Sequence, residues 1–312
     1  MAEKPGKIFP EKVYIEAPCK INLHLRVGEK RPDGFHDIES LFASLAFCDA
    51  LTFECGGEEG ECILSTDSSL GSGEDNLVYK AASLFRARTG FTNALRIFLE
   101  KRIPIGAGLG GGSSDAASTL LAMNFLAGNP ASMKELTEMA AVLGSDVPFF
   151  LAGGLAFVSG RGERIEPILL AESIFPRDLS VVLVKPPFSA DTAEAYRLLD
   201  KSREETGPQE SHSGGEELSK EAIIRFLGED PGAWPFRNDF LSIDNTGAYR
   251  AILESLRNAG ASFAALSGSG SCCFGIFIGR EMAEKVAKEL YMLGNFVRLT
   301  FFLANRAKPV VK

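Results

Sequence analysis

The feature that most constrains this chain of 312 residues is a glycine-rich segment, Pro104 to Asp115, that runs directly into a helical pattern. Five of the seven residues from Gly106 to Gly112 are glycine, and glycine lets a backbone approach a ligand closely. Residues 114–126 are strongly helical, with Ser113 or Ser114 expected as the cap. Free N–H groups at such a helix start, together with the helix dipole, favour phosphate binding. The alternative is a flexible linker, which a helix attached directly behind the glycines disfavours.

The glycine spacing also fits G-x-G-x-x-G at Gly106, Gly108 and Gly111, the fingerprint of dinucleotide-binding folds. That fold needs a strand after the helix, whereas here a second helical pattern follows at 132–143. The P-loop motif GxxxxGK[ST] and the protein-kinase motifs HRD and DFG do not occur. A non-catalytic or NAD-binding nucleotide module stays open as an alternative to a phosphoryl-transfer site.

Composition excludes several other classes. The chain has 33 Lys+Arg against 41 Asp+Glu, a net charge of −8, which argues against a partner held by nucleic-acid phosphates. Its six cysteines show neither zinc spacing nor a disulfide framework. No apolar run is long enough for a membrane span or a signal peptide. We expect a cytoplasmic monomer or homodimer with a small-molecule substrate and without nucleic-acid or membrane partners.

Hydrophobic periodicity predicts an α+β protein of two subdomains. In the first half we expect strands at 13–27, 41–53, 95–99 and within 153–168, and helices at 75–88, 114–126 and 132–143, the last with a capping box of Ser132 and Glu135. In the second half we expect strands at 179–185, 262–266, 272–278 and 296–303, and helices at 191–200, 246–258 and 281–293. With one helix set aside, this order is the ferredoxin-like β-α-β-β-α-β unit. We place the boundary within 165–176, giving domains 1–170 and 171–312, and expect 203–220 to be a mobile polar insertion.

Two polar side chains stand out in apolar surroundings. Lys20 lies on a predicted strand, with Asn22 and His24 on the same face. The alternative to a functional role is that this face of the strand is simply exposed to solvent. Asp146 precedes a very apolar run, and an ordinary helix cap is its alternative. Near a phosphate cradle, an aspartate that accepts a hydroxyl proton and a lysine that stabilises charge would suit phosphoryl transfer.

Three segments in order along the chain resemble the GHMP kinase superfamily, which includes galactokinase, homoserine kinase and mevalonate kinase. They are Pro18-Cys-Lys20-Ile-Asn22-Leu, the Pro104–Asp115 loop and Leu266-Ser-Gly268-Ser-Gly270-Ser-Cys. The pieces Arg31-Pro-Asp33-Gly34-Phe35-His36 and Gly144-Ser-Asp146-Val-Pro148-Phe narrow the resemblance to the branch that phosphorylates the 2-hydroxyl of a cytidine-diphosphate-linked methylerythritol. The resemblance implies an N-terminal ATP-binding domain and a ferredoxin-like C-terminal domain. Another GHMP-type kinase, with a homoserine or mevalonate acceptor, is the alternative.

The resemblance also implies roles for individual residues. Lys20 and Asp146 match the catalytic pair of the family. Substrate contacts fall on Asn22, Phe35, His36, Asp191 and Thr192, with His36 bonding cytosine. The ATP site falls on Pro104, Gly106, Ala107, Gly108, Leu109, Gly110, Gly111, Gly112, Ser113 and Ser114, and on the second loop of Gly268, Ser269 and Gly270.

Mg²⁺ is expected to accompany ATP because such transfers need charge neutralised between the β- and γ-phosphates, and Ser114 is the nearest protein ligand. Phe35 replaces a tyrosine common in the family and so lacks a hydroxyl donor. Lys101 and Arg102 lie just before the loop. They could contact the ATP phosphates, or they could be ordinary exposed charges at the end of a strand, and the sequence favours neither.

Overall fold

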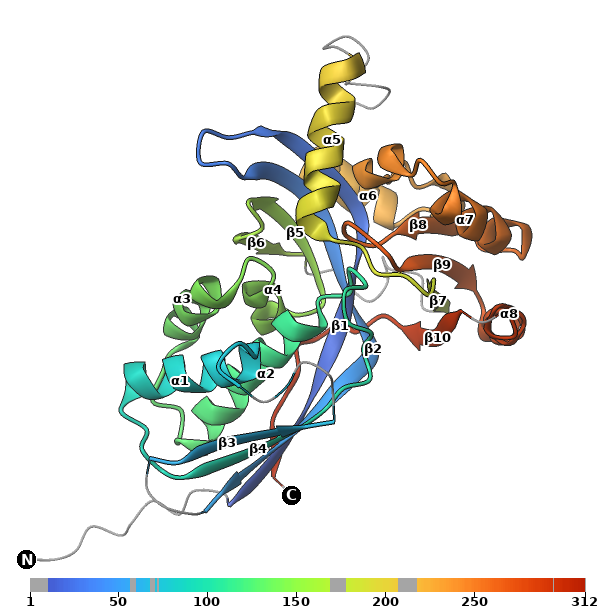
Figure 1. Ribbon diagram of the computed structural model, residues 1–312. Helices are drawn as coiled ribbons and strands as arrows, with labels where there is room; N and C mark the ends of the chain where they lie inside the picture. The colour runs from blue at the N-terminus through green and yellow to red at the C-terminus, as the bar shows by residue number, and fades with distance from the viewer. Residues whose placement is uncertain are drawn as a thin grey trace, which may run out of the picture.

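The computed structural model describes residues 11–56, 60–67, 71, 73–168, 178–206, 218–293 and 295–311. Within these ranges the chain forms two β-sheets flanked by helices (Figure 1). The α+β class and the two-part architecture expected from the sequence are therefore confirmed. In the described part of the chain, no helix is long and apolar enough to cross a membrane.

The first sheet is built around one long antiparallel hairpin. Its strands are β1 (Lys12–Lys30), β2 (His36–Cys55), β3 (Cys62–Thr66), β4 (Leu95–Glu100), β5 (Leu155–Gly160), β6 (Arg164–Pro167) and β11 (Val310–Val311). They run in the order β11-β1-β2-β4-β3, with β5 also paired to β2 and β6 to β5. Residues 50–55, at the C-terminal end of β2, pair with β4, and residues 38–43, near its N-terminal end, pair with β5. The connected ends of β1 and β2 project beyond the other strands of the sheet (Figure 1).

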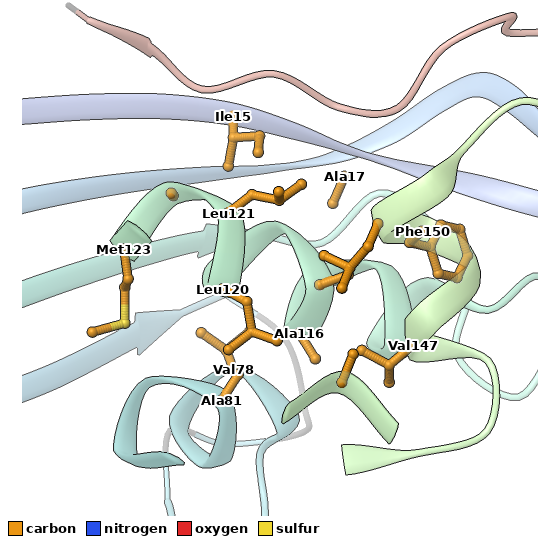
Figure 2. Packing of buried hydrophobic residues seen from close by; sticks show 14 of the residues in the cluster. Ile15, Ala17, Val78, Ala81, Ala116, Leu120, Leu121, Met123, Val147 and Phe150 are labelled. Atoms are coloured by element: carbon orange, nitrogen blue, oxygen red, sulfur yellow. The ribbon is translucent and has the colours of Figure 1, made fainter. Parts of the chain in front are cut away.

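Helices α1 (Leu77–Thr89), α2 (Gly111–Leu126), α3 (Met133–Leu143) and α4 (Val147–Ala152) gather on one side of this sheet. Figure 2 shows α2 between the sheet and α1, with Leu121 toward Ile15 and Leu120 toward Val78. Residues 114–124 of α2 are all buried, as expected for a helix with small or apolar residues on every side. The start of α2, which follows the glycine loop, is therefore held rigidly in the core.

The second sheet has the order β10-β7-β9-β8 and is antiparallel throughout. Its strands are β7 (Leu179–Lys185), β8 (Phe263–Leu266), β9 (Cys273–Ile278) and β10 (Phe296–Phe301). Helices α7 (Ala248–Asn258) and α8 (Arg280–Tyr291) pack on it, whereas α5 (Thr192–Thr206) packs mainly on the short 3₁₀ helix η2 (Asp239–Ile243). The expected ferredoxin-like order is present, and α5 is the extra helix. It stands beside the projecting end of the β1–β2 hairpin (Figure 1).

Several local expectations were incomplete. The sequence did not predict β3, α4, β11, α6 (Lys220–Leu227), η1 (Pro231–Ala233) or η2. Residues 203–206 of the expected mobile insertion are the last residues of α5, because the helix continues past position 200. Residues 207–217 of that insertion lie outside the described residues, as do residues 169–177, where the domain boundary was expected.

Candidate active site

The glycine loop ends in a helix start without a side-chain cap. Helix α2 begins at Gly111, and its N-cap residue is Gly110, which has a left-handed φ of 69°. The expected cap at Ser113 or Ser114 is therefore wrong, because a backbone turn at glycine starts the helix earlier. No side chain accepts a capping hydrogen bond there. The first N–H groups of α2 are left for an anion, which is the arrangement that phosphate sites use.

The two glycine loops are joined by one side-chain and one backbone hydrogen bond. Ser267 Oγ donates to Gly108 O at 2.9 Å, and the Cys272 N–H donates to Ala107 O at 3.1 Å. Gly108 has a φ of 71°, and a Cβ built on it would lie 2.2 Å from Ser267 O. Only glycine fits at position 108, because any side chain would force the loops apart. The family resemblance assigned both loops to the ATP site, and the structure brings the two loops into contact.

Lys20 is buried directly beneath this loop and is not on a solvated strand face. Its side chain is almost fully enclosed at 5% exposure, and its backbone N–H donates to Leu109 O at 2.9 Å. The ammonium group lies 2.7 Å from Asn22 Oδ1, 3.5 Å from Asp146 Oδ2 and 4.4 Å from the centre of the Phe42 ring. A buried lysine with these partners presents a fixed positive charge to the space above it.

Asp146 occupies the N-cap position of α4, but its side chain makes no capping hydrogen bond. The helix-cap alternative for this carboxylate is therefore wrong as far as hydrogen bonding is concerned. Its side chain is 31% exposed and faces Lys20. The carboxylate is thus accessible, oriented by Lys20, and suited to accept a proton from a hydroxyl group.

Asn22 has its polar atoms taken up by the protein. Its Oδ1 accepts from Lys20 Nζ and, at 2.9 Å, from the Gly268 N–H, while its Nδ2 donates to Ser40 Oγ at 2.9 Å. The side chain therefore joins the lysine to the second glycine loop. This bridging geometry adds a positioning role to the substrate contact expected of Asn22.

The other expected substrate residues fall on two elements. Phe35 is 55% exposed at the tip of the β1–β2 hairpin, with the Arg161 guanidinium 5.1 Å from its ring centre. Thr192 Oγ1 lies 2.9 Å from Ser269 Oγ, so the start of α5 touches the second glycine loop. Asp191 Oδ1 accepts from the Glu194 N–H at 2.9 Å and so supports the first turn of α5.

His36 is held by two residues that sequence reasoning missed. Its ring stacks on Tyr196 with a centroid distance of 4.9 Å, and its Nε2 lies 2.7 Å from Asp200 Oδ1. Both partners are on α5. Burial and the nearby charge of Asp146 raise the pKa of Tyr196 to about 12, which keeps its phenol neutral. Tyr196 and Asp200 are four residues apart on a predicted helix and therefore lie on the same face. This spacing was the feature of the sequence that could have indicated them as a pair.

Lys101 is not an exposed strand end, because its side chain is only 7% exposed and lies against the glycine loop. Its ammonium pairs with Asp49 and, at 2.7 Å, with Asp115 Oδ2. Asp49 Oδ1 also accepts from the Ile103 N–H at 2.8 Å. Burial raises the pKa of Asp115, and Lys101 opposes that shift. Arg102, in contrast, pairs with Glu100 at the exposed strand end. Asp49 and Asp115 were not anticipated as partners of Lys101.

A metal ligand set of protein side chains is not present in the described part of the chain, where no three His, Cys, Asp or Glu residues cluster. The Ser114 hydroxyl, in the first turn of α2, is buried and has no hydrogen-bond partner among the described residues. An orphaned hard oxygen beside a phosphate cradle fits a Mg²⁺ ion that is held mainly by phosphate oxygens.

Comparison with known proteins places this fold and site in a class. The family models described as GHMP kinases N terminal domain and GHMP kinases C terminal match residues 76–154 and 238–292. A homoserine kinase from Cytophaga hutchinsonii shares the fold, with a TM-score of 0.70 at 17% identity over 99% of this chain and 100% of that one. The fold and the site define a GHMP kinase, a class that uses ATP as phosphate donor.

More similar relatives narrow the class. The 4-diphosphocytidyl-2-C-methyl-D-erythritol kinase of Synechococcus sp. (strain CC9605) is 39% identical over 299 residues, covering 90% of this chain and 94% of that protein. A relative of the same name from Pelotomaculum thermopropionicum is 38% identical over 87% of this chain and 91% of its own. A crystal structure of 4-(cytidine 5'-diphospho)-2C-methyl-D-erythritol kinase matches with a TM-score of 0.73 at 33% identity, over 95% of this chain and 97% of that chain. The chain belongs to the family of 4-diphosphocytidyl-2-C-methyl-D-erythritol kinases.

Proposed function

We propose that this protein transfers the γ-phosphoryl group of ATP to the 2-hydroxyl of 4-diphosphocytidyl-2-C-methyl-D-erythritol, a step of non-mevalonate isoprenoid biosynthesis. The observation that carries this proposal is the Lys20–Asp146 pair, with 3.5 Å between Nζ and Oδ2, set beneath the glycine loop. In the reaction, Asp146 accepts the hydroxyl proton, the oxygen attacks the γ-phosphorus, and ADP leaves. Lys20 stabilises the negative charge that gathers on the attacking oxygen and the transferred group.

The glycine loop supplies the donor site. The uncapped N–H groups at the start of α2 provide hydrogen-bond donors for the triphosphate, and the second loop packs against the first. These groups are backbone atoms on rigid elements, so they need little reorganisation when charge develops. The acidic net charge of −8 is compatible with two anionic substrates, because attraction arises from these local groups and not from the whole surface.

Mg²⁺ belongs to this proposal as the companion of ATP. When bound, it neutralises charge between the β- and γ-phosphates. The Ser114 hydroxyl is the protein oxygen that would hold it, supported by its lack of a partner among the described residues. The remaining ligands would be phosphate oxygens and water.

The proposed setting is a reducing compartment such as the cytoplasm. All six cysteines are free thiols. Burial raises the pKa of Cys272 to about 12 and holds the pKa of Cys19 well above its usual value. Such thiols stay protonated and unreactive. We propose a monomer or homodimer, which sedimentation of the purified protein would measure.

Turnover of the cytidylylated acceptor tests the proposal. The purified protein is incubated with Mg²⁺–ATP and the acceptor, ADP release is followed, and the phosphorylated product is identified by phosphorus NMR. Homoserine and mevalonate serve as matched acceptors, and they are expected to give no turnover. Activity on either of them, or none on the cytidylylated acceptor, would contradict the assignment. Calorimetry with NAD in place of ATP tests the dinucleotide alternative, for which tight binding is the contrary result.

A further inference from the structure

One carboxylate ties α5 to the projecting hairpin. Asp200 Oδ1 lies 2.7 Å from His36 Nε2, and Asp200 Oδ2 accepts from Lys30 Nζ at 3.3 Å. Lys30 and His36 are paired residues at the ends of β1 and β2. Burial acts to raise the pKa of Asp200, but the hydrogen bonds from His36 and Lys30 outweigh it and hold the pKa below its usual value. Asp200 is therefore an ionised group that can only accept hydrogen bonds.

The imidazole of His36 is fixed on one face and along one edge. Its ring stacks on Tyr196 at an interplanar angle of 23°, and the residue is only 6% exposed. Rotation of the ring would break both the stacking and the bond to Asp200. Within the described residues, Nδ1 has no hydrogen-bond partner, so it is the free polar atom of the ring.

Which hydrogen-bonding character Nδ1 presents follows from Asp200. Because the carboxylate accepts, Nε2 must carry the proton. In a neutral imidazole whose Nε2 is protonated, Nδ1 holds a lone pair and accepts a hydrogen bond. A pyrimidine that offers an exocyclic amine to Nδ1 is thereby favoured over one that offers a carbonyl oxygen.

We propose that Asp200 is a positioning residue that fixes His36 as the Nε2–H tautomer, so that Nδ1 selects the amino group of cytosine over the carbonyl of uracil. The inference rests on the proposed function, in which the acceptor carries cytidine diphosphate beside His36. A site whose polar atom is left mispaired by the wrong base discriminates by about 10- to 100-fold. This selection falls on binding, so KM rather than kcat distinguishes the two bases.

Asp200→Asn is the decisive variant, because it keeps the size of the side chain. Lys30 donates to one oxygen of Asp200, so in the variant it retains the amide oxygen and turns the amide N–H toward His36. His36 Nε2 must then accept, and Nδ1 becomes a donor. We expect KM for the cytidylylated acceptor to rise about 10-fold, while KM for its uridine diphosphate analogue does not rise. Asp200→Glu, which retains a carboxylate, is expected to restore part of the preference.

Arg203→Met is the matched control. Arg203 also ties α5 to the hairpin, donating to Gly28 O at 2.9 Å and Val27 O at 2.7 Å, but it does not touch His36. Loosening α5 in this way is expected to leave the ratio of KM for the two bases unchanged. An equal loss of preference in Arg203→Met would overturn the proposal, since it would assign the effect to the attachment of α5.

Imidazole nitrogen NMR reads the tautomer without any turnover. The chain has three histidines, and His24 is an internal reference because its Nδ1 accepts from the Arg237 N–H. We expect the Nε2–H tautomer of His36 in the unmodified protein and a shift to Nδ1–H in Asp200→Asn. An imidazolium or an Nδ1–H ring in the unmodified protein would overturn the proposal. If the protein fails to turn over the cytidylylated acceptor, the proposed function fails, whereas the tautomer result stands separately.

Discussion

Lys20 and Asp146 face each other with 3.5 Å between Nζ and Oδ2, although one lies in the middle of β1 and the other at the start of α4. The lysine is enclosed, and the aspartate is partly open. This asymmetry suits the two roles, because a proton acceptor must reach the substrate, whereas a charge stabiliser is strongest where water is excluded. The glycine loop is fixed above the pair by the bond from the Lys20 N–H to Leu109 O.

Asp146→Asn removes the proton acceptor and keeps the shape of the side chain. We expect kcat to fall by about 100-fold or more, the usual contribution of a general base, with little change in the KM for ATP. Steady-state ADP release measures this. Asp75→Asn is the control, because Asp75 is fully exposed and lies outside the site. Near-normal turnover in a folded Asp146→Asn protein would remove Asp146 from the base role.

Gly108→Ala tests the contact between the two glycine loops. The added Cβ would meet Ser267 O at 2.2 Å, whereas in Gly112→Ala it would meet only the Leu77 side chain at 3.5 Å. Both changes keep the backbone N–H, so they differ in crowding and in the left-handed φ at 108. We expect ATP affinity, measured by calorimetry, to fall at least about 10-fold in Gly108→Ala, by a loss of at least ~1.4 kcal/mol. Gly112→Ala should bind normally, and equal affinities would count against a tight loop contact.

Lys101→Met tests the buried charge cluster beneath the loop. It leaves Asp49 and Asp115 in the interior without their cation, so we expect a loss of about 3–5 kcal/mol in the free energy of unfolding. Urea denaturation measures this loss. Lys80→Met is the control, since the pair that Lys80 makes with Asp75 at 3.9 Å is exposed, and this variant should unfold almost normally. Similar unfolding midpoints for both variants would mean that the cluster adds nothing to stability.

His24 makes stability depend on pH. Its imidazole accepts from the Arg237 N–H, and burial, together with Arg237 and Arg26, lowers its pKa to about 4. The unfolded chain binds this proton near the ordinary histidine pKa, so folding is favoured above that value and stability is lost as pH falls from about 6.5 toward about 4. Between about pH 7.5 and about pH 5 the loss from this group is about 2 kcal/mol.

His24→Asn isolates that contribution, because asparagine retains an acceptor for the Arg237 N–H and does not titrate. Urea unfolding curves for both proteins at the two pH values measure the difference between their slopes. We expect the variant to be less sensitive to acid, even if it is less stable at neutral pH. Identical pH dependence in the two proteins would contradict a lowered pKa for His24.

Local patterns predicted much of the fold. The capping box of Ser132 and Glu135 begins α3 as expected, and the apolar run at 179–185 is the buried strand β7. These features were predictable because capping bonds and strand alternation involve residues close in sequence. Helix α4 was missed because six apolar residues show too little periodicity to distinguish helix from strand.

At the site, prediction failed where a side chain is contacted by residues that are distant in the sequence. The sequence indicated Lys20, Asp146 and the glycine loops as a group, through motif resemblance. It left open whether Lys20 was solvated, because alternation along a strand does not say what covers each face. The structure covers that face with the glycine loop and Phe42. Lys101 was likewise ambiguous until the fold brought Asp49 and Asp115 to it.

The sequence by itself indicated a phosphate site, since a glycine-rich loop that leads directly into a helix offers free N–H groups to an anion, and its motifs indicated the GHMP kinase superfamily. Only the tertiary structure decided which charges are paired, which are buried, and that α5 presents Tyr196 and Asp200 to His36. The physical reason is that hydrogen-bond character and charge depend on surroundings. A histidine offers a donor or an acceptor according to the group on its far nitrogen, and here that group arrives from a distant helix.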